Sequence, residues 1–100
     1  MDNSVQYQLS VPLDHVCYAD HFPGEPIVPA ALFMQWVIEA VSKSFPDYVV
    51  DQVKSMKFLA VVKPGDECVL HLSVNAAKQS IKVEAHRSET LLCKGSMKFS

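Results

Sequence analysis

Residues 21–44, HFPGEPIVPAALFMQWVIEAVSKS, contain the two features that decide the fold of this chain. The first part places several prolines around Gly24, so we expect a stiff and extended loop. The second part, residues 30–44, has no glycine or proline and is apolar almost all round, which is typical of a helix covered by other structure. Pro29 suits the first turn of that helix, because the N–H that proline lacks would have no partner there. The sequence therefore predicts an irregular loop, over residues 13–29, that leads directly into a buried helix.

Strand patterns surround this helix. The run at 48–62 is rich in Val, Met and Phe and ends at KPGD, residues 63–66, which is a strong turn signal. Later segments alternate apolar and polar residues, as strands with one buried face do. We expect strands over residues 5–11, 48–62, 67–75, 81–86 and 91–99. In the last of these, one face should hold Leu91, Cys93, Gly95, Met97 and Phe99. The order predicts an α+β protein in which the helix covers one face of an antiparallel sheet.

The composition predicts one globular domain that has a partner. The chain has 100 residues, 49% hydrophobic and 20% charged, and domains usually contain about 100–150 residues. A chain of this length buries only about two-thirds of the surface that it exposes when unfolded, which favours association. The net charge is -2 and Arg87 is the single arginine, so we expect no nucleic-acid partner. The lysines are spread through the sequence without forming a cluster.

The N-terminal residues, the apolar runs and the cysteines each bear on where the protein is located. Residues 1–8 are polar and lack the apolar region of a targeting segment, and no apolar run reaches the roughly 18 residues of a membrane span. Cys17, Cys68 and Cys93 form no CxxC unit, so neither a disulfide framework nor a zinc site is indicated. We therefore expect a cytoplasmic, reduced protein that has no membrane partner.

Two stretches of the chain resemble a known family. HFPGEPIVPA, residues 21–30, resembles the HFPGxPxxPG signature of the 3-hydroxyacyl-acyl carrier protein dehydratases of the hotdog fold. KFLAVVKPGD, residues 57–66, is similar to that family's KFxxPVxPGD strand and turn. The short dehydratase-like proteins of aryl polyene pigment clusters are a further likeness. The resemblance covers most of the chain and implies a hotdog domain over residues 1–100, with an antiparallel sheet wrapped around one central helix.

The resemblance implies a role for each matching residue. His21 would remove the proton α to a thioester carbonyl, and the backbone N–H of Ala30 would hold the thioester oxygen. Physical chemistry supports both roles, because imidazole has a pKa of about 6.5 and the first N–H groups of a helix lie at its positive end. The substrate-binding surface implied by the resemblance includes Phe22, Gly24, Pro29, Ala30 and Ala31.

The chain departs from the family at two positions. The family has a carboxylate on the helix that protonates the leaving β-hydroxyl, and Gln35 stands at that position here. An amide can hold a hydroxyl by hydrogen bonds, but it has no proton to exchange near pH 7. Ala30 stands where the family has glycine, and its methyl group narrows the space for the substrate.

Three routes around the missing acid are open. His21 would shuttle both protons, Glu39 would reach back along the helix, or a partner chain would contribute the acid in a heterodimer. The implied reaction is dehydration of 3-hydroxyacyl to 2-enoyl thioesters on acyl carrier protein, in a homodimer or heterodimer of hotdog subunits, with no cofactor. The alternatives are a hotdog thioesterase and a non-catalytic thioester-binding subunit.

Other residues permit more than one interpretation. Phe33, Met34 and Trp36 either line an acyl tunnel or belong to the core. His21 is otherwise a loop residue that caps a carbonyl. Cys17 and His21 are a possible thiol–imidazole pair, which no other feature of the sequence supports. A metal site would consist of His15, Cys17, Asp20 and His21, but their spacing fits no familiar arrangement of metal ligands. We expect His71 and His86 to face outward from the sheet.

Overall fold

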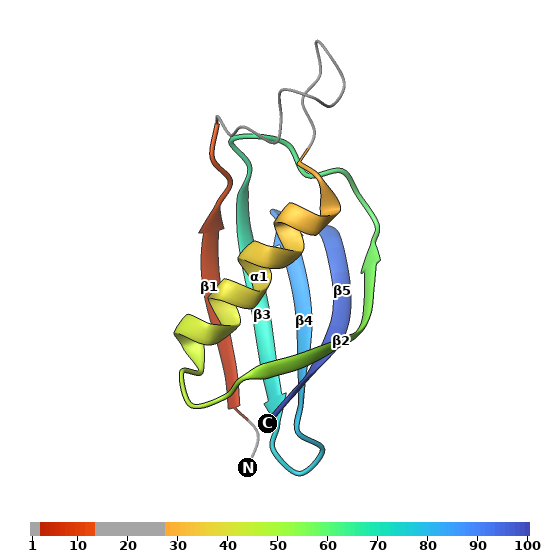
Figure 1. Cartoon of the computed structure of the whole chain (residues 1–100). Helices are drawn as coiled ribbons and strands as arrows, with labels where there is room; N and C mark the ends of the chain where they lie inside the picture. Colours follow the sequence, from red (N-terminus) through yellow and green to blue (C-terminus); the bar gives the residue numbers. More distant parts are fainter. Residues whose placement is uncertain (1–2, 14–27) are drawn as a thin grey trace.

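The structure is a computed structural model that describes residues 3–13 and 28–100. The described strands form a five-stranded antiparallel sheet in the order β1-β3-β4-β5-β2, and the helix α1 crosses one face of it (Figure 1). An antiparallel sheet with the helix on one face is the predicted arrangement, whereas the order of the strands was not predicted. The elements are β1 (Asn3–Ser10), α1 (Ala30–Ser44), β2 (Val50–Phe58), β3 (Glu67–Asn75), β4 (Ser80–Arg87) and β5 (Thr90–Phe99).

The core lies between α1 and the covered face of the sheet. Strand β3 alternates as predicted, with Cys68, Leu70, Leu72 and Val74 buried, and β4 buries Ile81, Val83 and Ala85 in the same way. The helix contributes Phe33, Val37, Ala40 and Val41 to the same cluster. Each fully buried aliphatic or aromatic side chain of this kind contributes about 1.5–3 kcal/mol to folding.

Helix α1 begins and ends where the sequence predicts, at Ala30 and Ser44. The sheet of this chain covers one side of α1, because one sheet can contact only one side of a helix. Leu32 and Trp36 are only half-buried, and an exposed stripe follows the side that faces away from the sheet. Residues 3–13 and 28–100 therefore leave this side of α1 uncovered.

Strand β2 is shorter than the run at 48–62 that predicts it. Its register with β5 is irregular between Val50 and Gln52 and again between Val53 and Ser55. After Phe58 the backbone N–H groups of residues 59 and 60 both donate to the carbonyl oxygen of Leu92, at 2.8 and 3.3 Å. A regular ladder gives each carbonyl a separate partner, so the strand ends there and the apolar residues that follow belong to a connection.

The last strand also differs from its prediction at one point. Ala85 pairs with Cys93 while His86 pairs with Leu91, so Leu92 is an extra residue on β5. This β-bulge changes which side chains face inward. Leu92 is fully buried and Leu91, which was expected on the core face, is only half-buried. Cys93, Met97 and Phe99 are buried as predicted.

Candidate functional site

The residues predicted to form the site divide into two groups. His21, Phe22 and Gly24 lie outside the described residues, and so do the other members of the suggested thiol and metal sites, so their roles stay predictions. Those that the structure places are Pro29, Ala30, Ala31, Phe33, Gln35 and Trp36. All of these lie on the first turns of α1 or immediately before it.

The chain on either side of residues 14–27 is bonded to the same turn. The N–H of Val11 donates to the carbonyl of Asp66 at 2.9 Å, and the N–H of Gly65 donates to the carbonyl of Val11 at 3.1 Å. On the other side, the N–H of Val28 donates to the carbonyl of Val62 at 2.9 Å. Val11 and Val28 are both buried. The segment that contains His21 therefore begins and ends on the connection between β2 and β3, next to the start of α1.

The turn at residues 63–66 has the geometry that its sequence predicts. Gly65 has a φ of 85°, a conformation that favours glycine, and the N–H of Asp66 donates to the carbonyl of Lys63 at 3.1 Å. The Asp66 carboxylate also accepts the N–H of Lys63, at 2.8 Å. Leu13 packs against the turn so closely that a Cβ on Gly65 would lie 2.8 Å from Leu13 Cδ2. The turn is thus a rigid base for the chain ends on either side of residues 14–27.

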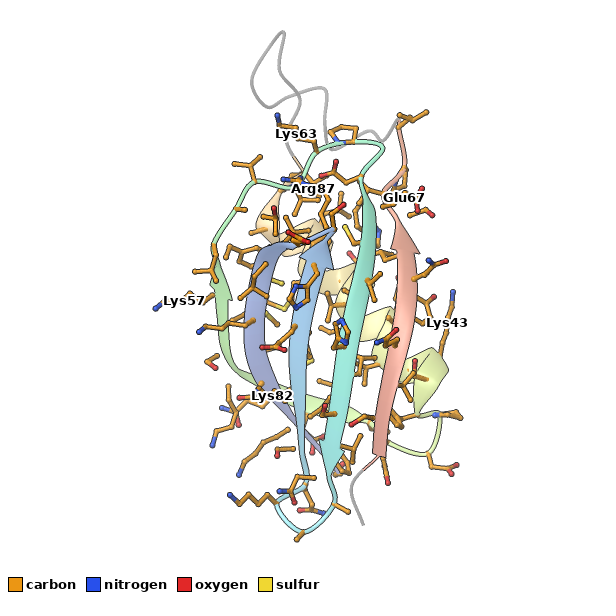
Figure 2. All side chains as sticks on the ribbon, turned by 180° about the vertical axis from the view of Figure 1, so that it is seen from behind. Lys43, Lys57, Lys63, Glu67, Lys82 and Arg87 are labelled. Atoms are coloured by element: carbon orange, nitrogen blue, oxygen red, sulfur yellow. The ribbon has the colours of Figure 1, made fainter. Side chains whose placement is uncertain are left out.

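Arg87 holds this turn from the end of β4. Its Nη1 donates to Asp66 Oδ2 at 2.5 Å and to the carbonyl of Val61 at 3.1 Å. The two side chains are partly shielded, at 32% exposed for Arg87 and 16% for Asp66. Figure 2 shows Arg87 at the same end of the sheet as Lys63. This positioning role of Arg87 was not predicted, although the single arginine of the chain and the aspartate of the PGD turn were available as signals in the sequence.

Among residues 3–13 and 28–100, no side chain caps the first N–H groups of α1. Pro29 is the N-cap with extended backbone, it makes no side-chain cap hydrogen bond, and the first turn has no acidic residue. The first hydrogen bond of the helix joins the N–H of Phe33 to the carbonyl of Pro29, at 3.1 Å. The N–H groups of Ala30 and Ala31 therefore have no partner within the helix, and both residues are exposed. This end can stabilise negative charge on a carbonyl oxygen.

Gln35 faces away from the chain's own sheet. It is exposed, and it shares the uncovered stripe of α1 with Ala31 and Glu39, which lie one turn before and after it and are also exposed. None of the described residues of this chain packs over that stripe to form a buried pocket. A site that uses Gln35 therefore needs a second chain, or the segment outside the described residues, to close it.

Phe33 and Trp36 differ in how deeply their side chains are buried in the core. Phe33 is fully buried, with ring centroids 6.2 Å from Phe58 and 6.4 Å from Trp36, both edge to face. Phe33 thus belongs to the core that joins α1 to β2. Trp36 and Met34 are half-buried at the edge of that core. The acyl tunnel stays a prediction, and Met34 and Trp36 are the residues placed to line one.

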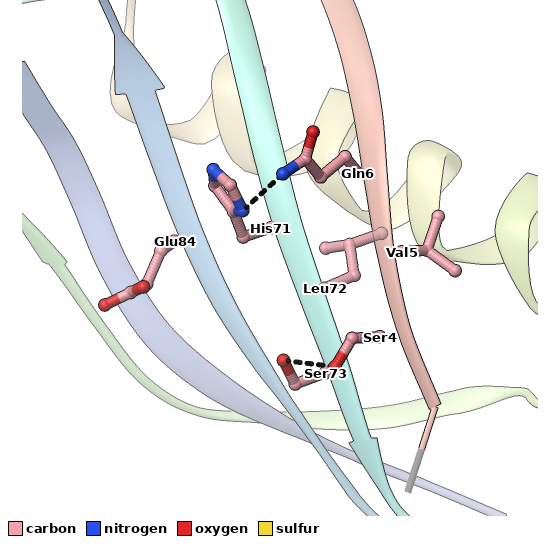
Figure 3. A pocket seen from close by; sticks show the side chains of 7 residues that line it. All are labelled: Ser4, Val5, Gln6, His71, Leu72, Ser73 and Glu84. Carbon is pink, nitrogen blue, oxygen red and sulfur yellow. Dashed lines mark hydrogen bonds between the residues drawn. The ribbon is translucent and has the colours of Figure 1, made fainter. Parts of the chain in front are cut away.

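The histidines of the sheet lie on the opposite face. His71 and His86 are cross-strand neighbours with ring centroids 5.1 Å apart, and His71 Nδ1 is 3.5 Å from Gln6 Nε2 (Figure 3). They face outward as predicted, on the side of the sheet away from α1, so they are not part of the helix-start site. Residues 3–13 and 28–100 contain no group of three or more His, Cys, Asp or Glu side chains arranged to hold a metal.

The two described cysteines are buried free thiols. Burial raises the pKa of Cys68 and the pKa of Cys93 from 9.0 to about 11. Thiols with so high a pKa are almost entirely protonated at neutral pH, and the thiolate is the reactive form. Neither residue is a candidate nucleophile.

Comparison with known proteins identifies the family. The family model named ApeI-like, for ApeI dehydratase, matches residues 1–96. The chain belongs to the ApeI-like dehydratase family. The 3-hydroxyacyl-(acyl carrier protein) dehydratase FabZ of Levilactobacillus brevis is 28% identical over 96% of this chain and 72% of its own length. The FabZ protein of Lactobacillus helveticus is 26% identical over 90% of this chain and 68% of its own length.

Solved structures confirm the predicted hotdog fold. The dehydratase heterocomplex ApeI:P from Xenorhabdus doucetiae has a TM-score of 0.83 and 18% identity, over 96% of this chain and 86% of its own. An uncharacterised protein from Erwinia carotovora has a TM-score of 0.80 and 23% identity, over 99% and 84%. The fluoroacetyl-CoA thioesterase FlK has a TM-score of 0.78 and 13% identity, over 98% and 84%. Within residues 3–13 and 28–100, no helix has the length and apolar character needed to cross a membrane.

Proposed function

We propose that this chain removes water from 3-hydroxyacyl thioesters carried by an acyl carrier protein and forms trans-2-enoyl thioesters. Membership of a dehydratase family supports the reaction class, and the curated FabZ relatives are named for a dehydratase of 3-hydroxyacyl groups on acyl carrier protein. The structural observation that supports it most is the anchoring of both ends of residues 14–27 beside the start of α1. That anchoring fixes where the segment that contains His21 leaves and rejoins the described chain.

In the proposed mechanism, His21 takes the proton from the carbon α to the thioester. The electron pair forms the α–β double bond, the β carbon–oxygen bond breaks, and the hydroxyl leaves as water with a proton. The N–H of Ala30 stabilises the negative charge that develops on the thioester oxygen. Gln35 holds the hydroxyl by hydrogen bonds, and the imidazolium formed at His21 returns its proton to the leaving oxygen. The proton taken from the α carbon thus ends on the leaving water, and no carboxylic acid on the helix is required.

The exposed position of Gln35 supports a site shared between two subunits. The uncovered side of α1 carries Ala31 and Gln35, both exposed in this chain. In the assembly that we propose, this side meets the loop of a partner subunit, which supplies the histidine. Strand β2 is an outer strand that pairs only with β5 in the described sheet, so it leaves an edge available for association. The partner is a second copy of this chain or another hotdog subunit.

The direct test is to incubate the protein with a 3-hydroxyacyl carrier thioester and to measure loss of water by mass spectrometry. The H21A variant should abolish turnover, because His21 is the proposed base and the described residues at the exposed start of α1, Ala30, Ala31 and Gln35, have no basic side chain. H71A is the matched control, since it removes an imidazole from the opposite face of the sheet. Full activity of H21A would exclude the mechanism.

A second function is favoured by Gln35 and Ala30 together. A chain without its own acid would serve as the non-catalytic, thioester-binding half of a heterodimer, and a structural neighbour was solved as a dehydratase heterocomplex. Turnover that appears only after addition of a second hotdog chain with Asp or Glu on its helix would support this function. Release of free thiol from the substrate would instead indicate a thioesterase, the activity of the neighbour FlK.

A further inference from the structure

The outward face of the sheet brings together two histidines that the proposed reaction does not use. His71 lies on β3 and His86 on β4, and their ring centroids are 5.1 Å apart with an angle of 84° between the ring planes. They are diagonal neighbours in the ladder, because His71 pairs with Glu84, two residues before His86. Both side chains are half-buried, and both strands have a neighbour on each side. The backbone therefore holds the two imidazoles at a fixed separation.

This separation is the one that a shared metal ion requires. A zinc–imidazole bond is about 2.0–2.1 Å long and a ring nitrogen lies about 1.1 Å from the ring centre, so the ion lies about 3.2 Å from each centroid. Two imidazoles at neighbouring corners of a tetrahedron then have centroids about 5 Å apart. The observed distance of 5.1 Å between His71 and His86 matches this value. Rotation of the rings is enough to bind one ion, and the strands need not move.

Gln6 of β1 orients the ring of His71. Its Nε2 atom is 3.5 Å from His71 Nδ1 (Figure 3). Histidines that bind a metal almost always use the second ring nitrogen for a hydrogen bond, which fixes the tautomer and the orientation of the ring. With the side-chain amide turned over, Gln6 Oε1 accepts the N–H of Nδ1, and Nε2 keeps the lone pair that binds an ion. In His71, Nε2 is therefore the metal ligand.

A hollow on the same face gives solvent and ions access to His71. It has a volume of about 380 Å³, and His71, Ser73 and Glu84 contribute to its lining. In the register, Glu84 of β4 stands between His71 of β3 and Lys94 of β5. The carboxylate at this position separates the ammonium group from the imidazole. Its negative charge offsets the lysine and favours a cation beside the two histidines.

The described chain supplies two ligands to this ion. Within residues 3–13 and 28–100, no third His, Cys, Asp or Glu side chain is arranged to join them. Water therefore completes the coordination, and the hollow has room for it. Among divalent ions, imidazole suits Cu²⁺, Zn²⁺ and Ni²⁺, whereas Mg²⁺ and Ca²⁺ prefer oxygen ligands. Cu²⁺ should bind most tightly, because it has the highest general affinity in this series.

Aromatic packing does not explain why both residues are histidine. An edge-to-face contact of two rings stabilises a pair of strands whichever aromatic residue supplies the rings. Packing also requires neither the amide of Gln6 beside one ring nitrogen nor the carboxylate position of Glu84 on the same face. Ion binding uses both features. A phenylalanine substitution separates the two explanations, because it keeps the ring and removes the nitrogen.

We propose that His71 and His86 bind one divalent transition-metal ion of the Cu²⁺, Zn²⁺ and Ni²⁺ class, with Gln6 as a positioning residue. The site lies on the face of the sheet away from α1, so it is separate from the proposed dehydratase site and does not depend on it. An ion that binds the folded chain and not the unfolded one raises Tm as its concentration rises.

The test titrates the full, untagged chain with Zn²⁺ by isothermal titration calorimetry and with Cu²⁺ by electron paramagnetic resonance. We expect one ion per chain, a Tm raised by Zn²⁺, and a Cu²⁺ spectrum that shows coupling to two imidazole nitrogens. Q6A should weaken Zn²⁺ binding about tenfold, and H71F and H86F should each weaken it further. The matched control is H15Q/H21Q, which removes the other two histidines of the chain and should leave binding unchanged.

Several results would overturn the proposal. Zn²⁺ binding that H71F and H86F leave unchanged would do so, as would the absence of saturable binding. Binding lost in H15Q/H21Q would place the ion at the other histidines. Half an ion per chain with a doubled mass would mean that the ion bridges two copies. If H71F does not fold, as judged by circular dichroism without metal, the Cu²⁺ spectrum of the parent protein decides, because coupling to fewer than two nitrogens contradicts the site.

Discussion

Removing the Arg87 guanidinium should loosen the turn to which both ends of the His21 segment are bonded. The variant R87M keeps most of the aliphatic stem and removes the donors to Asp66 Oδ2 and to the carbonyl of Val61. Hydrogen bonds to charged groups are worth about 1.5–3 kcal/mol each. Because the side chain of Arg87 is 32% exposed and that of Asp66 is 16% exposed, hydrogen bonds to water replace part of the lost interaction energy. We therefore expect a destabilisation of about 1–2 kcal/mol, which lowers Tm by about 5–15 °C in a domain of this size.

The R87M variant should lose turnover even under conditions in which it stays folded. At a temperature where circular dichroism shows R87M fully folded, kcat should fall about tenfold, because displacement of a positioned catalytic group is costly. R87K is the control, since it keeps the charge and loses the forked geometry, and it should be intermediate in both measurements. The double variant R87M/D66N should be little worse than R87M, because the two side chains act on each other. An R87M protein with the parent Tm and the parent kcat would refute the positioning role.

Further predictions concern single positions. Q35E should raise dehydration by the isolated protein if the missing acid limits it, and an unchanged rate in the mass assay would mean that the proton comes from elsewhere. G95A should lower Tm strongly, because its Cβ would lie 2.1 Å from the carbonyl oxygen of Ser55, and overpacking of this kind costs about 1–3 kcal/mol or more. Cys68 and Cys93 should resist a thiol reagent in the native protein and react fully after denaturation. Because the pKa of each thiol is raised from 9.0 to about 11 in the folded state, unfolded thiols ionise first, and stability should fall as pH rises through that window. The C68A/C93A variant should lose that part of the slope in a chemical denaturation series.

Local patterns predicted the elements well, because helix and strand periods depend on residues near one another in sequence. The limits of α1 follow from Pro29 before it and Pro46 after it, and both are visible in the sequence. The bulge at Leu92 was missed because it depends on how β4 and β5 align, which the β5 pattern alone does not contain. For the same reason Arg87 was overlooked, since its partners come from the connection between β2 and β3.

The side of α1 that the described sheet leaves uncovered is where the proposed second subunit would pack. A helix that is apolar almost all round is expected to be buried, but the chain's own sheet covers only the side with Phe33 and Val37. Leu32 and Trp36 remain half-buried beside Gln35, so a second subunit would bury apolar area there.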